Sequence, residues 1–427
     1  MGRPARSVIG ILILLALCLP AALPALAQES DTSIGGTLTR PEGEERVPVE
    51  GVVFVVTENG DEIGTGTSGP DGIWEVPLPG AGEYDVALQV DTLPVGVEPT
   101  DPERTELTDI SIREGQTRQV IFQLGEGSAG GVSTYSRLAS LFVTGLKLGA
   151  IIALSSVGLS LVFGVTGLVN FSHGELVSFG AVVAFFFHAA GLEWPLVLAA
   201  IPAILLGAAL GWGQEKVLWH PLRRRGMGLI SMIVISIGLS FVIRFLILIF
   251  YGGLPRAYPG YAGQGAVQFL GFSLVPKQVV TIVVSLIILV GVGLFLEKTR
   301  AGTALRAVRD SPDLSESSGI NVNKVIALTW TLGAALAAIG GVFFGLTESV
   351  QWDMGFRLLL LMFAAVILGG LGTAYGAMVG GFVVGIAVEM STLFIPTEIK
   401  NVVGLGLLII VLLVRPQGIL GVRERVG

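Results

Sequence analysis

The stretch GLVNFSHGEL at residues 167–176 places an imidazole, a carboxylate and two smaller polar side chains between two strongly apolar segments. Apolar flanks make such groups costly to desolvate, so they need partners, water or a function that justifies them. Asn170 and Ser172 are also suited to hydrogen-bond backbone that is freed at a helix break. The stretch therefore predicts a membrane-embedded helical fold with a polar junction between two spans.

Composition assigns most of the chain to a membrane. Hydrophobic residues make up 52% of the 427 residues, charged residues only 14%, and the mean hydropathy is +0.77. Soluble domains carry about 25% charged residues, so this composition indicates a polytopic membrane protein. The formal net charge of −7 argues against nucleic acid as a partner. The apolar excess fills residues 135–427, whereas residues 28–124 have the composition of a soluble domain.

Residues 1–27 have the three parts of a secretory signal peptide. Two arginines precede the apolar run 8–19, and Ala25-Leu26-Ala27 is a small-x-small cleavage sequence. The apolar run is too short for a comfortable span, although an uncleaved signal anchor is the alternative. The single cysteine, Cys18, lies inside this run, so cleavage leaves no thiol for a disulfide or a metal site. We expect neither a metal nor a cofactor.

Short alternating strands separated by turn residues predict a small antiparallel β-sandwich in residues 28–124. The turns 59–61 and 68–72 contain Asn, Asp and Gly, which tolerate the positive φ of tight turns. Several strands at this spacing are typical of a sandwich. The predicted strands are 52–56, 73–78, 84–88 and 119–124.

The spacing of Gly51, Gly60, Gly72 and Tyr84 resembles that of carboxypeptidase-regulatory-like and transthyretin-like sandwiches. The resemblance covers this domain alone and leaves two roles open for it. One is a module that docks a partner or captures substrate, and the other is a spacer or stabilising module. Residues 125–134 are rich in Gly and Ser and are expected to form a flexible linker.

Residues 135–427 contain apolar segments in quick succession, which predict an all-α membrane bundle of eight or nine spans. A span needs about 20 apolar residues, and the segments 357–371 and 400–414 are shorter than that. A broken or re-entrant helix, a common device in transporters, is an option for 357–371. The nine segments are 139–165, 172–190, 195–215, 228–251, 278–296, 325–346, 357–371, 374–393 and 400–414.

Basic residues in the loops predict which side of the membrane each end faces. Twelve lie on one side and five on the other, which places the first group in the cytoplasm. With an odd number of spans the sandwich then lies outside, in agreement with the signal peptide. The first group is Lys216, Arg223, Arg224, Arg225, Lys298, Arg300, Arg306, Arg309, Lys324, Arg415, Arg423 and Arg425, and the second is Arg137, Arg256, Lys277, Arg357 and Lys400.

The polar side chains of the 167–176 stretch are the candidate substrate pathway: Asn170, Ser172, His173 and Glu175. A structural role is the alternative. Glu175 would be favoured near the positive end of the helix that follows it, and Asn170 and Ser172 would hydrogen-bond the backbone of a broken helix.

Three further charged residues fall inside apolar segments and need an explanation. Arg244 and Glu389 are expected to face partners or a cavity, and a salt bridge between them is one option. Lys147 is expected to extend to the outer membrane interface, with the first span beginning near Gly149.

The segment 297–324 is rich in charge and is expected in the cytoplasm. Residues 303–308 would open a short helix, and Pro312 would start or break a turn. A short cytoplasmic helix between two spans would serve to dock a separate cytoplasmic subunit. An ordinary solvated loop is the alternative.

Motifs spread over residues 140–421 resemble those of the permease subunits of branched-chain amino-acid ABC importers. They are the 167–176 stretch, RAV at 306–308, GIN at 319–321, VIALT at 325–329, GAALAA at 333–338, LGGLG at 368–372, YGAMVGG at 375–381 and RPQGILG at 415–421. The N-terminal sandwich is a departure, because the typical family member lacks it.

This resemblance implies the roles of several residues and the partners of the chain. The expected ATPase-coupling loop contains Arg306, Ala307, Arg309, Asp310 and Gly319. The implied partners are a homologous second permease subunit, two cytoplasmic ATP-binding subunits, an extracytoplasmic substrate-binding protein and the lipid of the inner membrane. The implied substrates are leucine, isoleucine, valine or related amino acids. Urea and short-chain amide permeases form a sister group with similar motifs.

No lysine of this chain follows a glycine, so a GxxxxGK[ST] phosphate-binding loop is absent from the sequence. The chain is therefore expected to be a translocation subunit, not an enzyme, with ATP hydrolysed by separate subunits. An ATP-independent channel or secondary carrier is the alternative from a different class.

Overall fold

The computed structural model divides the chain into two compact units, with the boundary between Tyr135 and Ser136. The expected signal peptide and residues 125–133 of the expected linker lie outside the described residues. The structure describes residues 32–42, 45–58, 60–95, 97–99, 105–112, 117–120, 122, 124, 134–189, 192–261, 264, 267–269, 272–414 and 418–420.

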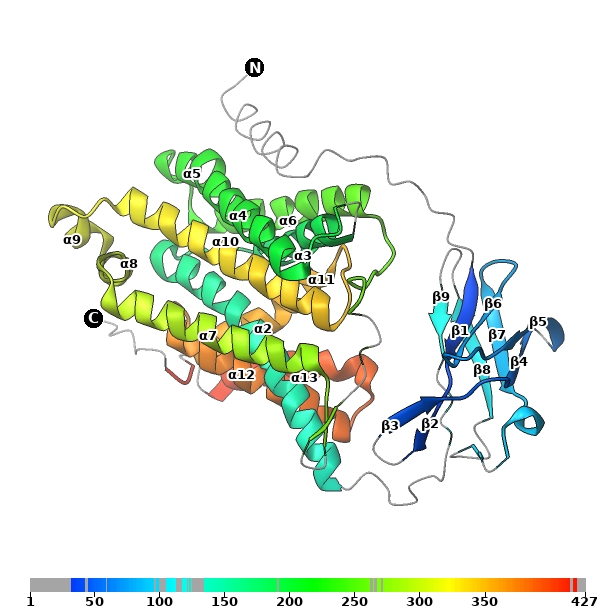
Figure 1. Cartoon of the computed structure of the whole chain (residues 1–427). Coiled ribbons are helices and arrows are strands. Elements are labelled where there is room, and N and C mark those ends of the chain that lie inside the picture. The colour runs from blue at the N-terminus through cyan, green and yellow to red at the C-terminus, as the bar shows by residue number, and fades with distance from the viewer. Residues whose placement is uncertain are drawn as a thin grey trace. The chain divides into compact units, whose positions relative to one another are not determined.

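The N-terminal unit is a β-sandwich, as predicted (Figure 1). One sheet has the strand order β5-β4-β7-β8, the other has the order β6-β1-β9, and β2 pairs with β3. The strands are β1 (Ser33–Thr37), β2 (Thr39–Glu42), β3 (Glu45–Pro48), β4 (Val53–Glu58), β5 (Asp61–Thr67), β6 (Ile73–Pro77), β7 (Gly82–Leu88), β8 (Glu106–Ile112) and β9 (Thr117–Gln119).

Alternation along the strands builds the core of the sandwich. In β6, Trp74 and Val76 are buried while their neighbours are exposed. The ring of Trp74 stacks on Phe54 with the centroids 3.9 Å apart, and Phe122 packs against Phe54 at 5.5 Å. These rings join the two sheets across the core.

The sandwich is not purely antiparallel, which corrects the prediction. β1 pairs antiparallel with β6 but parallel with β9. The chain reaches β9 by a connection from the other sheet and not by a hairpin, and such connections allow a parallel pair. Of the predicted strand 119–124, only Gln119 belongs to β9, while residues 121 and 123 lie outside the described residues.

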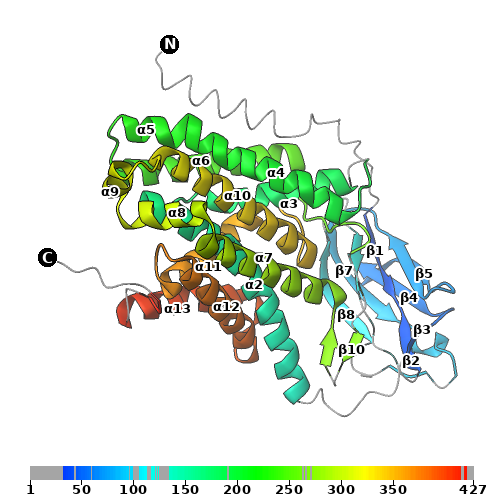
Figure 2. The same cartoon turned by 60° about the vertical axis from the view of Figure 1, so that its left-hand side comes forward.

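The C-terminal unit is a helical bundle, which confirms the predicted fold class (Figures 1 and 2). Its elements are α2 (Thr134–Thr166), α3 (His173–Ala189), α4 (Leu196–Gln214), the π-helical turn η3 (Glu215–Trp219), α5 (His220–Arg224), α6 (Leu229–Tyr251), β10 (Val267–Phe269), β11 (Phe272–Leu274), α7 (Pro276–Lys298), α8 (Arg300–Asp310), α9 (Pro312–Ser317), α10 (Val322–Thr347), α11 (Met354–Gly369), α12 (Ala374–Met390), the 3₁₀ turns η4 (Ser391–Leu393) and η5 (Thr397–Ile399), and α13 (Lys400–Val414).

Six helices of the described chain are long and apolar enough to cross a membrane, fewer than the eight or nine predicted. They are α2, α4 with its extension through α5, α6, α7, α10, and α12 with η4. The other three predicted spans are the shorter apolar helices α3, α11 and α13. The predicted segments are therefore helices, but hydropathy does not report how deep in the bundle each helix begins.

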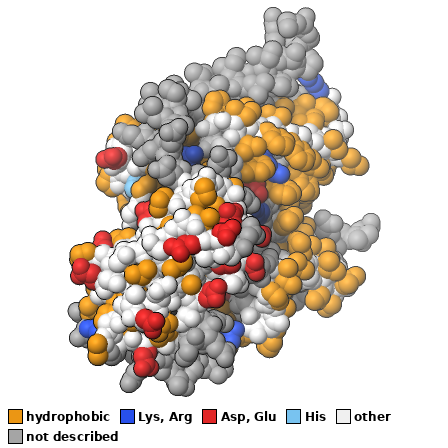
Figure 3. All heavy atoms as spheres, turned by 90° about the vertical axis from the view of Figure 1, so that its right-hand side faces the viewer, with side chains coloured by type: hydrophobic (Ala, Val, Ile, Leu, Met, Phe, Trp, Pro, Cys, Tyr) orange, Lys and Arg blue, Asp and Glu red, His pale blue; other side chains and the backbone are white. Residues whose placement is uncertain are grey.

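Helices α2 and α10 form the centre of the bundle, because 83% and 72% of their apolar windows are buried, against 33% for α6 and α7. Glycines allow the two central helices to touch: a Cβ added at Gly158 would lie 2.5 Å from the carbonyl oxygen of Gly333. Hydrophobic side chains crowd the visible surface of the helical unit, whereas acidic side chains are spread over the sandwich (Figure 3).

The bundle has two ends, which we name by one residue each. The Arg309 end contains α8, α9 and the turns 225–228 and 370–373. The Glu389 end contains the last turn of α12 and the first turn of α13. The long helices α2 and α4 run toward the Arg309 end and α10 and α12 run toward the Glu389 end, and the shorter helices α3 and α11 carry the chain back between them (Figure 1).

Two of the short helices begin inside the bundle and run in opposite directions. The first residue of α3, His173, contacts Ser155, which lies eleven residues, or roughly 16 Å, before the end of α2. The first turn of α11 contacts Ser178, eleven residues before the end of α3, through a 2.9 Å bond from the Gly355 amide to the Ser178 hydroxyl. The broken helix considered for 357–371 thus corresponds to α11.

The contact between α3 and α11 has no room for a side chain at Gly355. A Cβ there would overlap the carbonyl oxygen of Gly174, so we expect Gly355→Ala to cost about 1–3 kcal/mol of stability. Gly238→Ala in α6 is the matched control, because a Cβ at Gly238 meets no atom within 4 Å. The melting temperature of the purified full-length protein in detergent should fall for Gly355→Ala and stay unchanged for Gly238→Ala. Equal melting temperatures for the two variants would contradict the close approach.

Candidate functional site

The polar junction forms where the chain leaves α2 and turns back into the bundle. Gly167 ends α2 with φ +67°, and its amide donates to the carbonyl oxygen of Phe163 at 2.7 Å. The Asn170 side-chain oxygen then accepts bonds from the Ser172 amide at 3.1 Å and the Ser172 hydroxyl at 2.7 Å. This Asx turn starts α3 and satisfies backbone that would otherwise be unpaired in an apolar setting.

His173 is fully enclosed at the first position of α3. Its Nε2 lies 3.1 Å from the carbonyl oxygen of Ser155, which can only accept, so Nε2 carries the proton and donates. Nδ1 is buried and has no hydrogen-bond partner among the described residues. The imidazole therefore holds α3 against α2 and keeps one acceptor free.

Glu175 forms a buried ion pair with Arg244 of α6. One carboxylate oxygen, Oε1, accepts bonds from Arg244 Nε at 3.0 Å, from Arg244 Nη2 at 2.6 Å and from the Ser240 hydroxyl at 2.8 Å. The guanidinium also lies over the ring of Phe356 in α11, 3.9 Å from its centroid. The pair thus connects α3, α6 and α11 at one depth.

The suggested salt bridge between Arg244 and Glu389 is wrong, because each residue has another partner. Arg244 pairs with Glu175, and Glu389 pairs with Lys400 at 2.7 Å across the α12–α13 connection. Lys147 is also placed differently from the prediction. Its ammonium is buried and lies 3.0 Å from the Glu348 carboxylate, and the first span begins well before Gly149.

The four candidate pathway residues lie together at the junction, and three of them retain a buried polar atom without a partner among the described residues. These atoms are Asn170 Nδ2, His173 Nδ1 and Glu175 Oε2, with Ser155 Oγ beside them. Buried polar atoms are usually paired, so each of these atoms has an unused capacity for a hydrogen bond. The same residues also start α3 and join it to α2 and α6 through their hydrogen bonds and the ion pair. They therefore have a structural role as well.

At the Arg309 end, the predicted short helix is longer than expected and is followed by a second one. The Thr299 hydroxyl caps α8 by accepting from the Gly302 amide at 3.0 Å. The Ser311 hydroxyl caps α9, and Pro312 occupies the first turn of α9. Gly319, with φ +84°, ends this pair of helices before Asn321 caps α10.

Helix α8 is amphipathic, which distinguishes it from an ordinary solvated loop. Its buried face consists of Gly302, Leu305 and Val308 at three-residue spacing. Arg306, Arg309 and Asp310 are exposed, and Ala307 is half-buried. The Arg309 guanidinium pairs with the Asp310 carboxylate at 3.0 Å. The helix thus offers a charged surface while it is anchored to the bundle.

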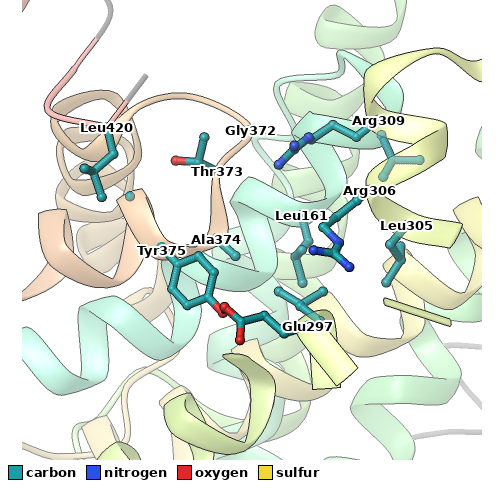
Figure 4. A pocket seen from close by; sticks show the side chains of 13 residues that line it. Leu161, Glu297, Leu305, Arg306, Arg309, Gly372, Thr373, Ala374, Tyr375 and Leu420 are labelled. Atoms are coloured by element: carbon teal, nitrogen blue, oxygen red, sulfur yellow. The ribbon is translucent and has the colours of Figure 1, made fainter. Parts of the chain in front are cut away.

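A cavity of about 340 Å³ lies beneath α8 and connects it to three other helices (Figure 4). Arg306 and Arg309 line one wall, and the turn 372–376 lines another. The Tyr375 hydroxyl donates to the Glu297 carboxylate at 2.8 Å, which ties the start of α12 to the end of α7. A displacement of α8 would therefore act on α2, α7 and α12 together.

A second cavity, of about 270 Å³, lies at the Glu389 end, where the sequence predicts no site. It is lined by charged residues from four separate elements, including Glu348, Arg357, Glu389 and Lys400. The sequence predicts three of these only singly, Glu389 as a charge inside a span and Arg357 and Lys400 as loop cations. Their convergence depends on the folding of α10 to α13 and has no local signal.

Comparisons with known proteins agree with this architecture. Residues 141–412 match the family described as the permease component of branched-chain amino acid transport systems. The chain is similar to the high-affinity branched-chain amino acid transport system permease protein LivH of Salmonella typhimurium, with 36% identity over 65% of this chain and 93% of LivH. It is also similar to BraD of Pseudomonas aeruginosa, described in the same words, with 35% identity over 65% of this chain and 94% of BraD.

A more distant similarity links the chain to the ribose import permease protein RbsC of Escherichia coli, with 28% identity over 54% of this chain and 72% of RbsC. No solved structure matches the chain. The multi-pass helical bundle and the family match define the chain as a membrane translocation subunit without enzymatic activity of its own. More particularly, the chain belongs to the family of branched-chain amino acid permease components.

The Glu175–Arg244 pair gives a test of the junction. Because removal of one partner leaves an uncompensated buried charge, we expect Glu175→Met and Arg244→Met each to cost about 3–5 kcal/mol. The double variant should recover much of this loss, since neither charge remains. The melting temperatures in detergent of the unmodified protein, the two single variants and the double variant form a double-mutant cycle. Strictly additive losses would show that the two residues do not depend on each other.

Proposed function

We propose that the chain is the translocation subunit of a binding-protein-dependent ABC importer for branched-chain or related amino acids. Two separate ATPase subunits would supply the energy, and a second homologous permease would complete the pathway. The positive-inside distribution supports a cytoplasmic Arg309 end, with the Glu389 end and the sandwich outside. Alternating access between the two ends would then carry the substrate inward.

The observation that carries this proposal is the form of α8. A capped, amphipathic helix with exposed charged side chains and a firmly packed apolar face suits a lever between an ATPase and the bundle. The cavity beneath it, closed by the Tyr375–Glu297 bond, gives the lever contact with the moving helices. A solvated loop would not need this buried apolar face.

Substrate class is supported by the relatives. The relatives described as branched-chain amino acid permeases match nearly their whole length, whereas the ribose permease matches less of its length at lower identity. Urea or short-chain amide transport is the alternative within the same class. An ATP-independent channel or secondary carrier is the alternative outside it, and it would have no use for α8 as a docking helix.

Two roles are open for the sandwich: it docks a partner or captures substrate, or it is a spacer or stabilising module. Its exposed surface is acidic, with few described basic residues, which suits the docking of a basic partner such as a region of the binding protein. A spacer role requires no such surface. The exposed acids are Glu50, Asp61, Glu62, Asp71, Glu75, Glu83, Asp91, Glu98, Glu106 and Asp109.

Uptake of labelled leucine tests the proposal directly. Cells that contain the partner subunits would be compared with and without this chain, with unlabelled urea as competitor. We expect leucine uptake that requires the chain and ignores urea. Chain-dependent entry of urea or amides, without leucine uptake, would keep the importer mechanism and move the substrate to the sister group. Uptake that persists without ATPase subunits would contradict the importer.

Reversal of charge on α8 tests the coupling role. We expect Arg306→Glu/Arg309→Glu to abolish leucine uptake, because the charge of the exposed α8 surface and of the cavity wall beneath it would be reversed, while membrane insertion stays normal. Arg225→Glu is the matched control: Arg225 is exposed at the same end but lies off α8. Uptake would be measured at equal amounts of membrane-inserted protein. Undiminished uptake by the α8 variant would exclude the coupling assignment.

A further inference from the structure

The cavity at the Glu389 end has a wall that combines both signs of charge with an apolar surface. Two acids, Glu348 and Glu389, and two bases, Arg357 and Lys400, line it, so its charged side chains sum to zero. Such a wall favours neither a simple anion nor a simple cation. A ligand that carries one charge of each sign matches it best.

Ion pairs hold these charges at fixed positions. Lys400 Nζ lies 2.7 Å from Glu389 Oε1, with the Glu389 side chain only 5% exposed. Arg357 is held by Asp353 at 2.9 Å, and Glu348 is held by Lys147 at 3.0 Å. The charged groups come from the α10–α11 connection, α11, α12 and α13, so the cavity is built by elements far apart in sequence.

The rest of the cavity fits a small aliphatic group. Leu148, Phe344, Met354, Leu358 and Leu361 supply apolar surface next to the charges. The volume of about 270 Å³ has room for about nine waters at ~30 Å³ each, which is the size of one small amino acid. Pockets for drug-sized ligands start near 300 Å³, so larger molecules are not favoured.

We propose that this cavity binds the free zwitterionic form of an aliphatic α-amino acid before it crosses the bundle. The ligand's ammonium group would lie against Glu389 and Glu348, its carboxylate against Lys400 and Arg357, and its side chain against the leucines. This inference rests on the proposed function and deepens it, because it assigns substrate selection to the permease itself. In the proposed orientation, the cavity faces the side from which substrate arrives.

The same chemistry separates amino acids from amides. Urea and short-chain amides have no charged groups, so they form no ion pairs with the fixed charges of the cavity. An amino-acid zwitterion has one charged group of each sign. An amino acid replaces part of each existing ion pair with an equivalent charge-assisted bond, so the buried charges stay compensated when it binds. The site is thus selective for zwitterions over neutral amides.

The first test is ligand-induced stabilisation of the purified full-length permease, without partner subunits, in detergent. Leucine in the millimolar range should raise the melting temperature by binding the folded state. Leucinol, which lacks the carboxylate, 4-methylpentanoate, which lacks the amine, and urea should each fail to do so. Stabilisation by none of the four, or by all of them equally, would overturn the proposal.

The second test is substitution at the charges. We expect Lys400→Gln to weaken leucine binding at least tenfold and Lys400→Arg to restore most of it. Arg225→Gln at the opposite end should leave binding unchanged. Arg357→Gln repeats the test at a half-exposed position if Lys400→Gln lowers the yield of folded protein. Unchanged leucine binding in both charge-removing variants would overturn the assignment.

The two proposals fail in distinguishable ways. Leucine uptake by the unmodified chain with its partner subunits reports on the importer, whether or not the cavity binds leucine. If uptake is present but the isolated permease ignores leucine, the importer stands and the cavity assignment falls. If the isolated permease binds leucine but no uptake occurs in any partner combination, the importer assignment falls.

Discussion

The bundle depends on a carboxylate and a guanidinium that are buried together in an apolar setting. Glu175 and Arg244 would each be prohibitively costly to bury alone, so the helices that carry them must meet in one register. The Ser240 hydroxyl and the face of Phe356 complete the surroundings of the pair. Because α3, α6 and α11 all contribute, this interaction fixes where the two broken helices begin.

That starting depth explains both the polar motif and the glycines around it. A helix that begins inside a membrane protein exposes unpaired amides where no bulk water is present. The Asn170 side-chain oxygen accepts from the Ser172 amide at the start of α3, and the Ser178 hydroxyl accepts from the amide of Gly355 in α11. Gly174 and Gly355 allow the two helix starts to touch. The polar residues and the glycines of this region therefore stabilise the same junction.

Sequence patterns predicted the helical segments closely because long apolar runs are local signals. The amphipathic helix α8 was also accessible, since the spacing of Gly302, Leu305 and Val308 is local. The partners of the buried charges could not be predicted from local sequence patterns. Lys147 and Glu348 lie 201 positions apart, and hydropathy does not distinguish their pairing from any other. For the same reason, the parallel pairing of β1 with β9 and the cavity at the Glu389 end required the folded chain.

The opposed starts of α3 and α11 have one more consequence, which concerns ion leakage. Each helix start carries about half a positive charge from its backbone dipole, and here two such starts face one another. The nearby side chains cancel, since Glu175 and Asp353 are matched by Arg244 and Arg357. Glu175 in the first turn of α3 and Asp353 at the N-cap of α11 lie next to the positive ends of these dipoles, and each carboxylate is also paired with an arginine. If the pathway of the proposed importer passes this depth, a sodium ion or proton would find no unpaired carboxylate to neutralise its charge, so the arrangement would favour a molecule without net charge.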